Sequence, residues 1–370
     1  GEMKLTEDWK RMIKPKGIKD DIIAGLTVGC ASLPLSLAIA DASNLSPTIG
    51  VTSAVVGGTI ASLFGGTTLA ITGPSAAMGI ILSDMVVKYG AHTVVSITLL
   101  CGIYQLLTSY TKLPLLISKI PKSVSTGFSF GVGSIITISQ LPKILGIKLH
   151  HDIMQNGNIS IITNLIENMG QYQPTSIAIA ISTLCLFKLL PLINNKIPPI
   201  MSSIFIITTI SYFLGLDIPV VGSMDPIDLS ISFPLMEIPQ SISEHKISFV
   251  NDILISSLSV YILASLESLL SSSLADKLSN KDIPNHNPKQ ELFGQGLSNI
   301  SSSLFNGMPV TSVIARTTLN ISLNAKTRRS SLIHCLTLFG LSTLFFPLIS
   351  HIPTACISST LLMIAYKLFS

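Results

Sequence analysis

The sequence has few charged residues, and this shortage excludes an ordinary water-soluble domain. Asp, Glu, Lys and Arg make up 11% of its 370 residues, whereas a soluble domain carries about a quarter. Hydrophobic residues make up 48%, and the mean hydropathy is +0.62. We therefore expect a chain that lies mainly in a lipid bilayer. Nothing in it indicates an enzyme or a nucleic-acid-binding protein.

Cysteine and histidine are sparse and are not clustered. The five cysteines stand singly in apolar stretches, and no two have the spacing of a metal or redox site. The seven histidines form no HExxH-like motif. We predict no cofactor and no resident metal, and we interpret the cysteines as small hydrophobic residues of helices.

Long apolar runs are what the sequence does contain. Runs of about 17–25 such residues are typical of membrane helices. We predict twelve crossings, two of them broken, at about 22–43, 48–64, 67–88, 91–110, 123–140, 175–193, 198–215, 250–275, 291–305, 306–323, 331–350 and 354–369. The first run is too long, and too closely followed by others, to be a cleaved signal peptide.

The basic residues predict the orientation, because cytoplasmic loops are enriched in Lys and Arg. With a cytoplasmic N-terminus, most basic residues fall inside, and the outer loops receive Lys88, Lys143, Lys148 and Lys246. Residues 1–20 are then a basic cytoplasmic lead-in, which either lies at the lipid headgroups through Trp9 or is a solvated tail. The acidic connection 216–249 falls outside. We expect a multi-pass protein of the plasma (inner) membrane.

Two apolar runs are broken, one at Gly73-Pro74 and one between Gly307 and Arg316. Irregular backbone at membrane depth is tolerated only where it is buried in protein or lines a cavity, so each break marks a site. "TGPSAA" predicts a strand at about 68–72 and a helix that starts at Pro74 or Ser75. "PVTSVIARTT" predicts a second strand and a helix from Ala315 or Arg316.

Half-helices that start near the midplane present free backbone N–H groups and positive dipole ends, which together attract an anion. The hydroxyl groups of the two first turns can add donors. The predicted binding residues at the two breaks are Gly73, Pro74, Ser75, Ala76, Ala315, Arg316 and Thr317.

Two charged residues stand inside the predicted spans. Arg316 is the basic residue assigned to a span interior, and an intramembrane charge of this kind is functional by default. The alternative is a structural arginine that pairs with a carboxylate or caps backbone carbonyls. Glu267 is the acid at the centre of the span 250–275, where low dielectric lets a carboxylate carry a proton. With Ser271 one turn further on, it could instead ligate Na⁺, or it could be the structural partner of Arg316.

The two halves of the chain repeat one order of elements. In each half, a long span and a second span lead to a break, and a complete span then ends at Ile-Pro, within 118–121 and 350–353. An odd number of crossings joins the halves, so they are inverted in the membrane. The first repeat covers 21–215 with seven spans, and the second covers 250–370 with about five. By this count, the last two spans of the second repeat are absent.

Four stretches of the sequence resemble the sulfate permease (SulP) family of anion transporters, in the form of its bacterial members. They are residues 20–66, "ITGPSAAM" at 71–78, "LASLESLLSSSLADKL" at 263–278, and 287–334, which contains "NGMPVTSVIARTTLN". The resemblance implies a seven-plus-seven inverted-repeat fold in which a core domain moves against a gate domain. It implies that Leu35 and Ile39 line the substrate cavity, although both also suit ordinary helix packing. It also implies that the coupling carboxylate lies in the span of Glu267.

Family members usually carry two further spans and a cytoplasmic STAS domain, and we expect neither in this sequence. The expected function is secondary active transport of sulfate, bicarbonate or a small dicarboxylate by alternating access, coupled to H⁺ or Na⁺ through Glu267. An uncoupled anion channel and a non-transporting fragment stay open as alternatives. The expected partners are the small anion, the coupling ion and the lipid bilayer, and a homodimer also stays open.

Overall fold

The computed structural model describes residues 3–117, 122–147, 157–194, 199–222, 227–232 and 246–369. Its helices are α1 (Leu5–Ile13), α2 (Ile18–Ala42), α3 (Pro47–Phe64), α4 (Ala76–Tyr89), α5 (His92–Ser109), α6 (Leu113–Ile117), α7 (Lys122–Leu145), α9 (Gly157–Glu167), a 3-10 turn (Met169–Gln171), α10 (Pro174–Ile193), α11 (Pro199–Phe213), α12 (Lys246–Leu278), α13 (Pro288–Leu304), α14 (Ile314–Ser322), α15 (Arg329–Leu344), α16 (Phe346–Ile349) and α17 (Thr354–Phe369). The strands among these residues are β1 (Thr72–Gly73) and β2 (Thr311–Ser312).

Each of the twelve predicted spans contains a helix of the described chain. Five of these helices, α2, α3, α5, α10 and α12, are long and apolar enough to cross a membrane by themselves. The helices of the two broken spans, α4 and α14, are shorter, because a strand precedes each of them. The predicted helical fold with two short strands leading into half-helices is therefore confirmed.

The order of elements occurs twice along the chain. A long helix, a second helix, a strand with a half-helix, a full helix, a short helix and a last helix appear first as α2 to α7 and again as α12 to α17. The contacts repeat as well: α2 packs against α15 as α12 packs against α5, while α3 meets its counterpart α13 and α7 meets α17. The two strands pair antiparallel, with Thr72 opposite Ser312 and Gly73 opposite Thr311.

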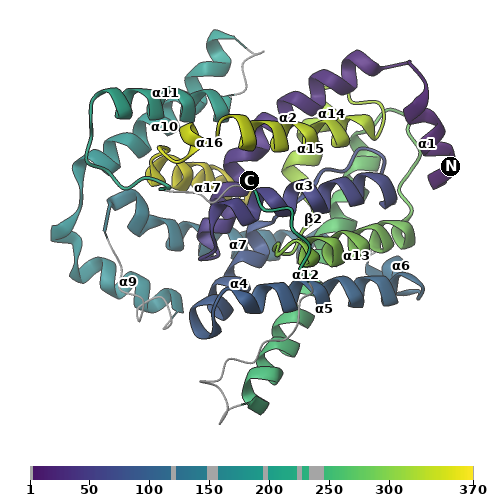
Figure 1. Ribbon diagram of the computed structural model, residues 1–370, viewed down its shortest axis with the longest axis horizontal. Coiled ribbons are helices and arrows are strands. Elements are labelled where there is room, and N and C mark those ends of the chain that lie inside the picture. Colours follow the sequence, from purple (N-terminus) through teal and green to yellow (C-terminus); the bar gives the residue numbers. More distant parts are fainter. Residues whose placement is uncertain are drawn as a thin grey trace.

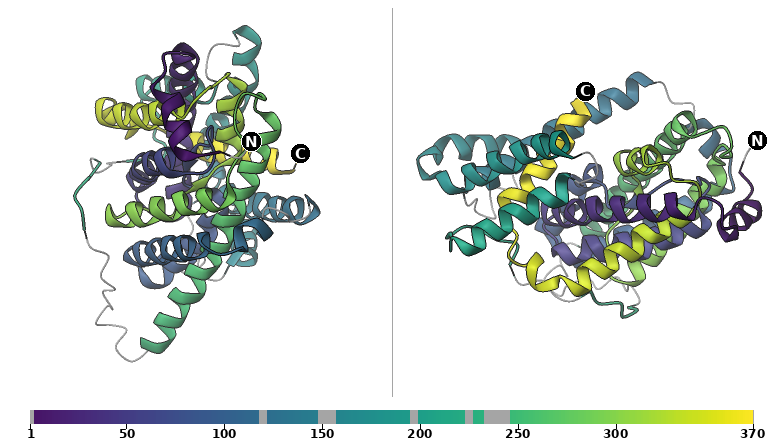
Figure 2. Two further views of the ribbon diagram at one scale, coloured as in Figure 1. Left: turned by 90° about the vertical axis from the view of Figure 1, so that its right-hand side faces the viewer. Right: turned by 90° about the horizontal axis from the view of Figure 1, so that it is seen from above.

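The helices form two groups that lie side by side (Figure 1). What we call the core group consists of α1 to α6, α12 to α15 and both strands. The gate group consists of α7, α9, α10, α11 and α17, and lies on the left in Figure 1. The two groups meet where α2 contacts α11 and α17, and where α4 contacts α7. In Figures 1 and 2, α12 runs through the core group and its N-terminal end projects beyond the other helices.

Small residues let the helices of the core group approach closely. A Cβ atom added to Gly25 or Gly29 of α2 would collide with α15, and one added to Gly57 of α3 would collide with Val310 beside β2. Close approach at glycine gives van der Waals contact that does not depend on exclusion of water, which is what helices in a bilayer use. The breaks at β1 and β2 are thus held in a tightly packed surround.

The basic lead-in at 1–20 contains helix α1, and two side chains of this helix bond to residues elsewhere in the protein. Asp8 of α1 is buried and forms an ion pair with Arg328, with 2.5 Å between its Oδ2 and Nε. Trp9 is half-buried and donates a hydrogen bond to the Leu63 carbonyl at 2.7 Å, so it is bound to the end of α3. Whether Trp9 also lies at the lipid headgroups stays a prediction. Helix α2 begins at Ile18, inside the predicted lead-in.

Several predicted features lie partly or wholly outside the described residues. They are the Ser-Lys-Ile-Pro motif at 118–121, the basic residues Lys148 and Lys196, and much of the connection 216–249. In the described part of that connection, Val221 donates a backbone hydrogen bond to Ile352, and Ser232 donates one to Leu304. The connection therefore contacts the start of α17 and the end of α13. Helix α12 begins at Lys246, before the predicted start of the second repeat at 250.

Candidate functional site

The site is built where β1 and β2 cross and the two half-helices begin. Helix α4 starts at Ala76, with Ser75 as its N-cap, and the Ser75 hydroxyl accepts a hydrogen bond from the Ala77 N–H at 3.3 Å. Helix α14 starts at Ile314, with Val313 in an extended conformation before it. Both starts differ from the predicted ones by one or two residues. The predicted strand at 68–72 is shorter, since pairing is confined to Thr72 and Gly73.

Side chains satisfy the backbone of both broken segments. In the segment before α14, the Asn299 amide accepts from the Val310 N–H at 2.8 Å and donates to the Val310 carbonyl at 3.1 Å. Nearby, Ser53 accepts from the Met308 N–H at 2.7 Å. In the segment before α4, Thr317 accepts from the Ile71 N–H at 3.1 Å. An unpaired backbone group at membrane depth costs several kcal/mol, so these contacts make the irregular backbone tenable.

A ladder of polar side chains on α13 connects the strands to one another. Gln295 donates to the Thr72 hydroxyl at 2.9 Å and to the Glu291 carboxylate at 2.9 Å. Asn299, one turn further on, donates to Gln105 of α5 at 2.8 Å. All of these side chains are buried. The sequence analysis missed this ladder, although polar residues spaced by four in a helix of the core could have indicated a polar face.

Arg316 lies in the first turn of α14 and is 2% exposed. Within the described chain, no hydrogen-bond partner is found for its Nε or for either of its two terminal nitrogens. One terminal nitrogen packs against Gly73, where an added Cβ would collide with it. No ion pair joins Arg316 to Glu267 or to another carboxylate of the described residues. Arg316 thus lies buried beside β1 with its donors unused.

Glu267 is half-buried on α12 and faces the other half-helix. Its Oε2 accepts a hydrogen bond from the Ser75 hydroxyl at 2.6 Å. Ser271, one turn further along α12, accepts from the Ser312 hydroxyl at 3.1 Å and donates to Thr317 at 3.3 Å. The same face of α12 therefore contacts the start of α4 through Glu267 and the start of α14 through Ser271. Between them, Ser268 shares a 2.6 Å hydrogen bond with Thr311.

A cavity of about 830 Å³ reaches the start of α4 from the side of the gate group. Ala76 and Ile39 line it, together with residues of α7, α12 and α17. The exposed side chains of Asp84 and Ile255 also line it, so it is open to the surroundings. Leu35, one turn before Ile39, is buried but is not among the lining residues.

The structure therefore brings most of the predicted site residues together. Gly73, Ser75, Arg316 and Thr317 lie in or beside the crossing, and Glu267 and Ser271 contact it from α12. Pro74 and Ala315 are the neighbours of these residues in the chain, and Ala76 and Ile39 face the cavity. The other predicted residues, Leu35, Arg316 and Glu267 included, are not among the residues that line it.

Several apolar helices long enough to cross a membrane, together with two half-helices that meet at antiparallel strands, define a polytopic membrane protein with discontinuous helices. The sequence model of the sulfate permease family matches residues 18–370. The chain belongs to the sulfate permease family.

Individual relatives agree with this assignment. The chain is 27% identical over 356 residues to "Putative sulfate transporter YvdB" of Bacillus subtilis, covering 94% of this chain and 64% of that one. It is 28% identical over 363 residues to the bicarbonate transporter BicA of Picosynechococcus sp., covering 95% and 61%. The chain thus spans less than two thirds of these relatives. They are named as transporters and not as enzymes, in agreement with the expectation from sequence.

Two solved structures have the same fold. The transmembrane domain of a cyanobacterial bicarbonate transporter BicA aligns with a TM-score of 0.85 at 25% identity, covering 97% of this chain and 91% of that one. The structure of SLC26A9 aligns with a TM-score of 0.83 at 18% identity, covering 98% and 60%. The prediction of a SulP-type membrane fold is confirmed by these likenesses.

Proposed function

We propose that this chain transports a small anion across the membrane by alternating access, and that the anion binds at the crossing of the two half-helices beside Arg316. The observation that carries the proposal is the buried guanidinium group, whose three nitrogens have no hydrogen-bond partner in the described chain. A buried charge without compensation costs several kcal/mol. An anion at the half-helix starts would offset this cost, with the positive helix ends assisting.

The substrate class we propose is an inorganic oxyanion or a small carboxylate. Relatives that match nearly the whole chain are named as transporters of sulfate and of bicarbonate, and a small dicarboxylate carries the same charged groups. A planar guanidinium forms paired hydrogen bonds with oxygens of such anions. Sulfate, bicarbonate and fumarate are therefore the first substrates to compare.

We further propose that H⁺ or Na⁺ is coupled to the anion through Glu267. Support comes from the hydrogen bond between Glu267 and Ser75, which links the carboxylate to the first turn of α4. Glu267 forms no ion pair in the part of the chain that is described, so a cation is needed to neutralise it at this depth. A simple anion channel gains nothing from a half-buried acid beside its path.

The proposed topology follows the distribution of basic residues. It has the N-terminus in the cytoplasm of a plasma-membrane protein, a first repeat over 21–215 and an inverted second repeat from 250. The repeated order of elements and contacts supports this division. A homodimer is compatible with this topology.

Uptake into proteoliposomes tests the proposal. Labelled sulfate, bicarbonate and fumarate are offered with imposed pH or Na⁺ gradients. We expect one class of anion to accumulate, and accumulation to depend on one of the two gradients. Flux that ignores both gradients would favour a channel, and absence of flux for every anion would overturn the transport proposal.

Two variants locate the anion and the coupling site. Arg316→Ala should lose anion affinity, and Arg316→Lys should recover part of it because the charge is retained. Glu267→Gln should bind the anion but no longer respond to the gradient. The matched control is Asp84→Asn, which neutralises an exposed acid of the cavity that Ala76 lines and should leave coupling intact. Full affinity in Arg316→Ala would reduce the arginine to a structural residue.

A further inference from the structure

Five ion pairs occur among the described residues, and one of them joins the core group to the gate group. It connects Lys143, near the end of α7, with Asp41, near the end of α2. The other four lie within the core group: Lys88–Asp252, His286–Asp276, Arg328–Asp8 and Arg329–Asp21. Among the described residues, Lys143 and Asp41 therefore form the ion pair that crosses the boundary between the core group and the gate group. The two groups would have to move relative to each other at this boundary.

One partner of this ion pair, Lys143, lies in the wall of the cavity that reaches Ala76 at the start of α4. Lys143 lines the 830 Å³ cavity, as do Ser139 and Gln140 one turn earlier on α7. Ala76 of α4 and Ile39 of α2 line it from the core side. Asp41 and Ile39 both belong to the last turns of α2, and Lys143 and Ile39 both line the cavity.

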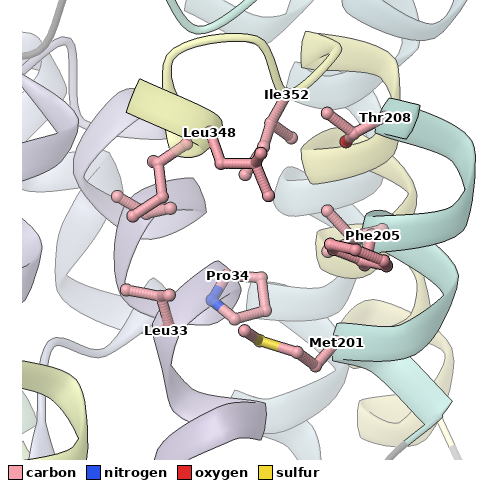
Figure 3. Close-up of a pocket in the computed structure, with 10 residues that line it drawn as sticks. Leu33, Pro34, Met201, Phe205, Thr208, Leu348 and Ile352 are labelled. Atoms are coloured by element: carbon pink, nitrogen blue, oxygen red, sulfur yellow. The ribbon is translucent and has the colours of Figure 1, made fainter. Parts of the chain in front are cut away.

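Elsewhere the two groups meet through apolar surfaces. Figure 3 shows Leu33 and Pro34 of α2 facing Met201, Phe205 and Thr208 of α11, with Leu348 and Ile352 beyond them. A cavity of about 50 Å³ remains between these side chains. Apolar contacts of this kind have no preferred direction, and an unfilled gap leaves the packing incomplete. They oppose sliding less than a directed ionic hydrogen bond does.

We propose that Lys143 and Asp41 form a latch that holds the core and gate groups in the arrangement seen here, and that release of this latch is a step of transport. The inference rests on the proposed function, because the step has meaning only if the two groups move. In the proposed topology the latch lies on the outer side. It lies away from Arg316 and Glu267, so it acts on the movement of the two groups and not through contact with the anion.

The exposure of the pair suits a reversible latch. The side chains are 26% and 35% exposed, so water reaches both and the desolvation cost of a buried pair is avoided. Partly exposed ion pairs shift a two-state population by up to about fivefold. A latch of this strength biases the arrangement without locking it.

Cysteine accessibility tests the latch without requiring transport. Ser139→Cys places a thiol in the cavity, in a chain whose accessible Cys30 and Cys185 are replaced by serine. We expect Lys143→Ala and Asp41→Ala to slow its alkylation by a membrane-impermeant maleimide by up to about fivefold, because the arrangement with this cavity becomes less populated. Charge exchange in Lys143→Asp with Asp41→Lys should restore the rate.

The control is the ion pair Lys88–Asp252, which joins α4 to α12 inside the core group at 2.5 Å. Lys88→Ala removes a comparable surface pair and should leave the alkylation rate unchanged. In proteoliposomes, the latch variants should change the rate of anion uptake, whereas Lys88→Ala should not. The latch is overturned if the variant with exchanged charges is alkylated no faster than the two variants with a single reversed charge. It is also overturned if Lys88→Ala slows alkylation as much as Lys143→Ala does. If the wild type transports no anion, the proposed function fails while the alkylation result still stands.

Discussion

Ser75 joins the start of α4 to the carboxylate of Glu267 through a hydrogen bond of 2.6 Å. The same hydroxyl group accepts from the Ala77 N–H and caps the helix. One side chain therefore ties the half-helix of the first repeat to the long helix α12 of the second. A change in the charge of Glu267 therefore alters the hydrogen bond between its carboxylate and the start of α4.

Replacing Ser75 should disturb both roles. Ser75→Ala removes the cap, which costs about 0.5–2 kcal/mol, and leaves Glu267 without its donor. We expect a lower thermal midpoint and a changed dependence of anion uptake on the coupling ion. Ser75→Thr retains the hydroxyl group and is the control. If the alanine variant keeps the gradient dependence of the wild type, the link between Ser75 and Glu267 has no part in coupling.

Gly73 should accept a side chain only if Arg316 moves. The Cβ of Gly73→Ala would collide with the Arg316 guanidinium, which lies at the far end of a flexible side chain and can be displaced. We expect the displaced arginine to raise the KM for the anion by on the order of tenfold or more.

Gly340→Ala on α15 is the matched change for Gly73→Ala. Nothing lies within 4 Å of its added Cβ, so it should be neutral or stabilising by up to about 1 kcal/mol. An unchanged KM in Gly73→Ala would mean that the position of the guanidinium does not matter for binding.

Asn299 should be needed for a folded strand segment. Asn299→Leu removes the partner of both the N–H and the carbonyl of Val310, and each buried polar group left unpaired costs about 1–3 kcal/mol. We expect a clearly lower thermal midpoint in detergent than that of Asn299→Gln, which keeps both kinds of hydrogen-bonding atom.

Asn251→Leu provides the second comparison, because Asn251 is exposed on the same helix as Glu267. Its midpoint should stay close to that of the wild type. Equal midpoints for Asn251→Leu and Asn299→Leu would contradict a role of Asn299 in holding the strand.

The N-terminal helix should contribute to stability through Asp8. Asp8→Ala leaves Arg328 buried without its carboxylate, and breaking a buried ion pair costs about 3–5 kcal/mol. Arg328 keeps its hydrogen bonds to the carbonyls of Ser62 and Gly65, so the loss should fall at the lower end of that range. Thermal unfolding measures it. Glu7→Ala, an exposed acid one residue away, should have little effect, and similar midpoints for the two variants would argue against the ion pair.

The positions of the breaks and of their charges could be read from the sequence. Glycine and proline interrupt an apolar run at Gly73-Pro74, and a single charge inside an apolar run is conspicuous at Arg316 and Glu267. These signals are local, because each depends on residues next to one another in the chain. They predicted the crossing of two half-helices, which the structure has.

The partners of buried polar groups could not be read from the sequence. Asn299 and Gln105 are separated by 194 residues, and Asp8 and Arg328 by 320. A polar residue in a helix indicates that a partner exists but does not identify it. The helix starts were also misjudged, because Ser75 serves as the cap of α4 and not as its first residue. Capping depends on hydrogen bonds that are settled by the packed surroundings.

The pairing of β1 with β2 has a consequence for biosynthesis. The Ile71 N–H and the Thr317 hydroxyl that accepts its hydrogen bond are 246 residues apart, and ribosomes add about 5–20 residues per second. The first half-helix therefore exists for on the order of ten seconds or more before the strand that completes its backbone has been made. During that interval the backbone of the segment at 69–73 lacks the hydrogen-bond partner that it needs in the hydrocarbon core. Insertion of the first half is therefore incomplete until the second half has been made. The half-helix reaches its final packing only after the second half has been made, so the candidate site is one of the last parts of the molecule to form.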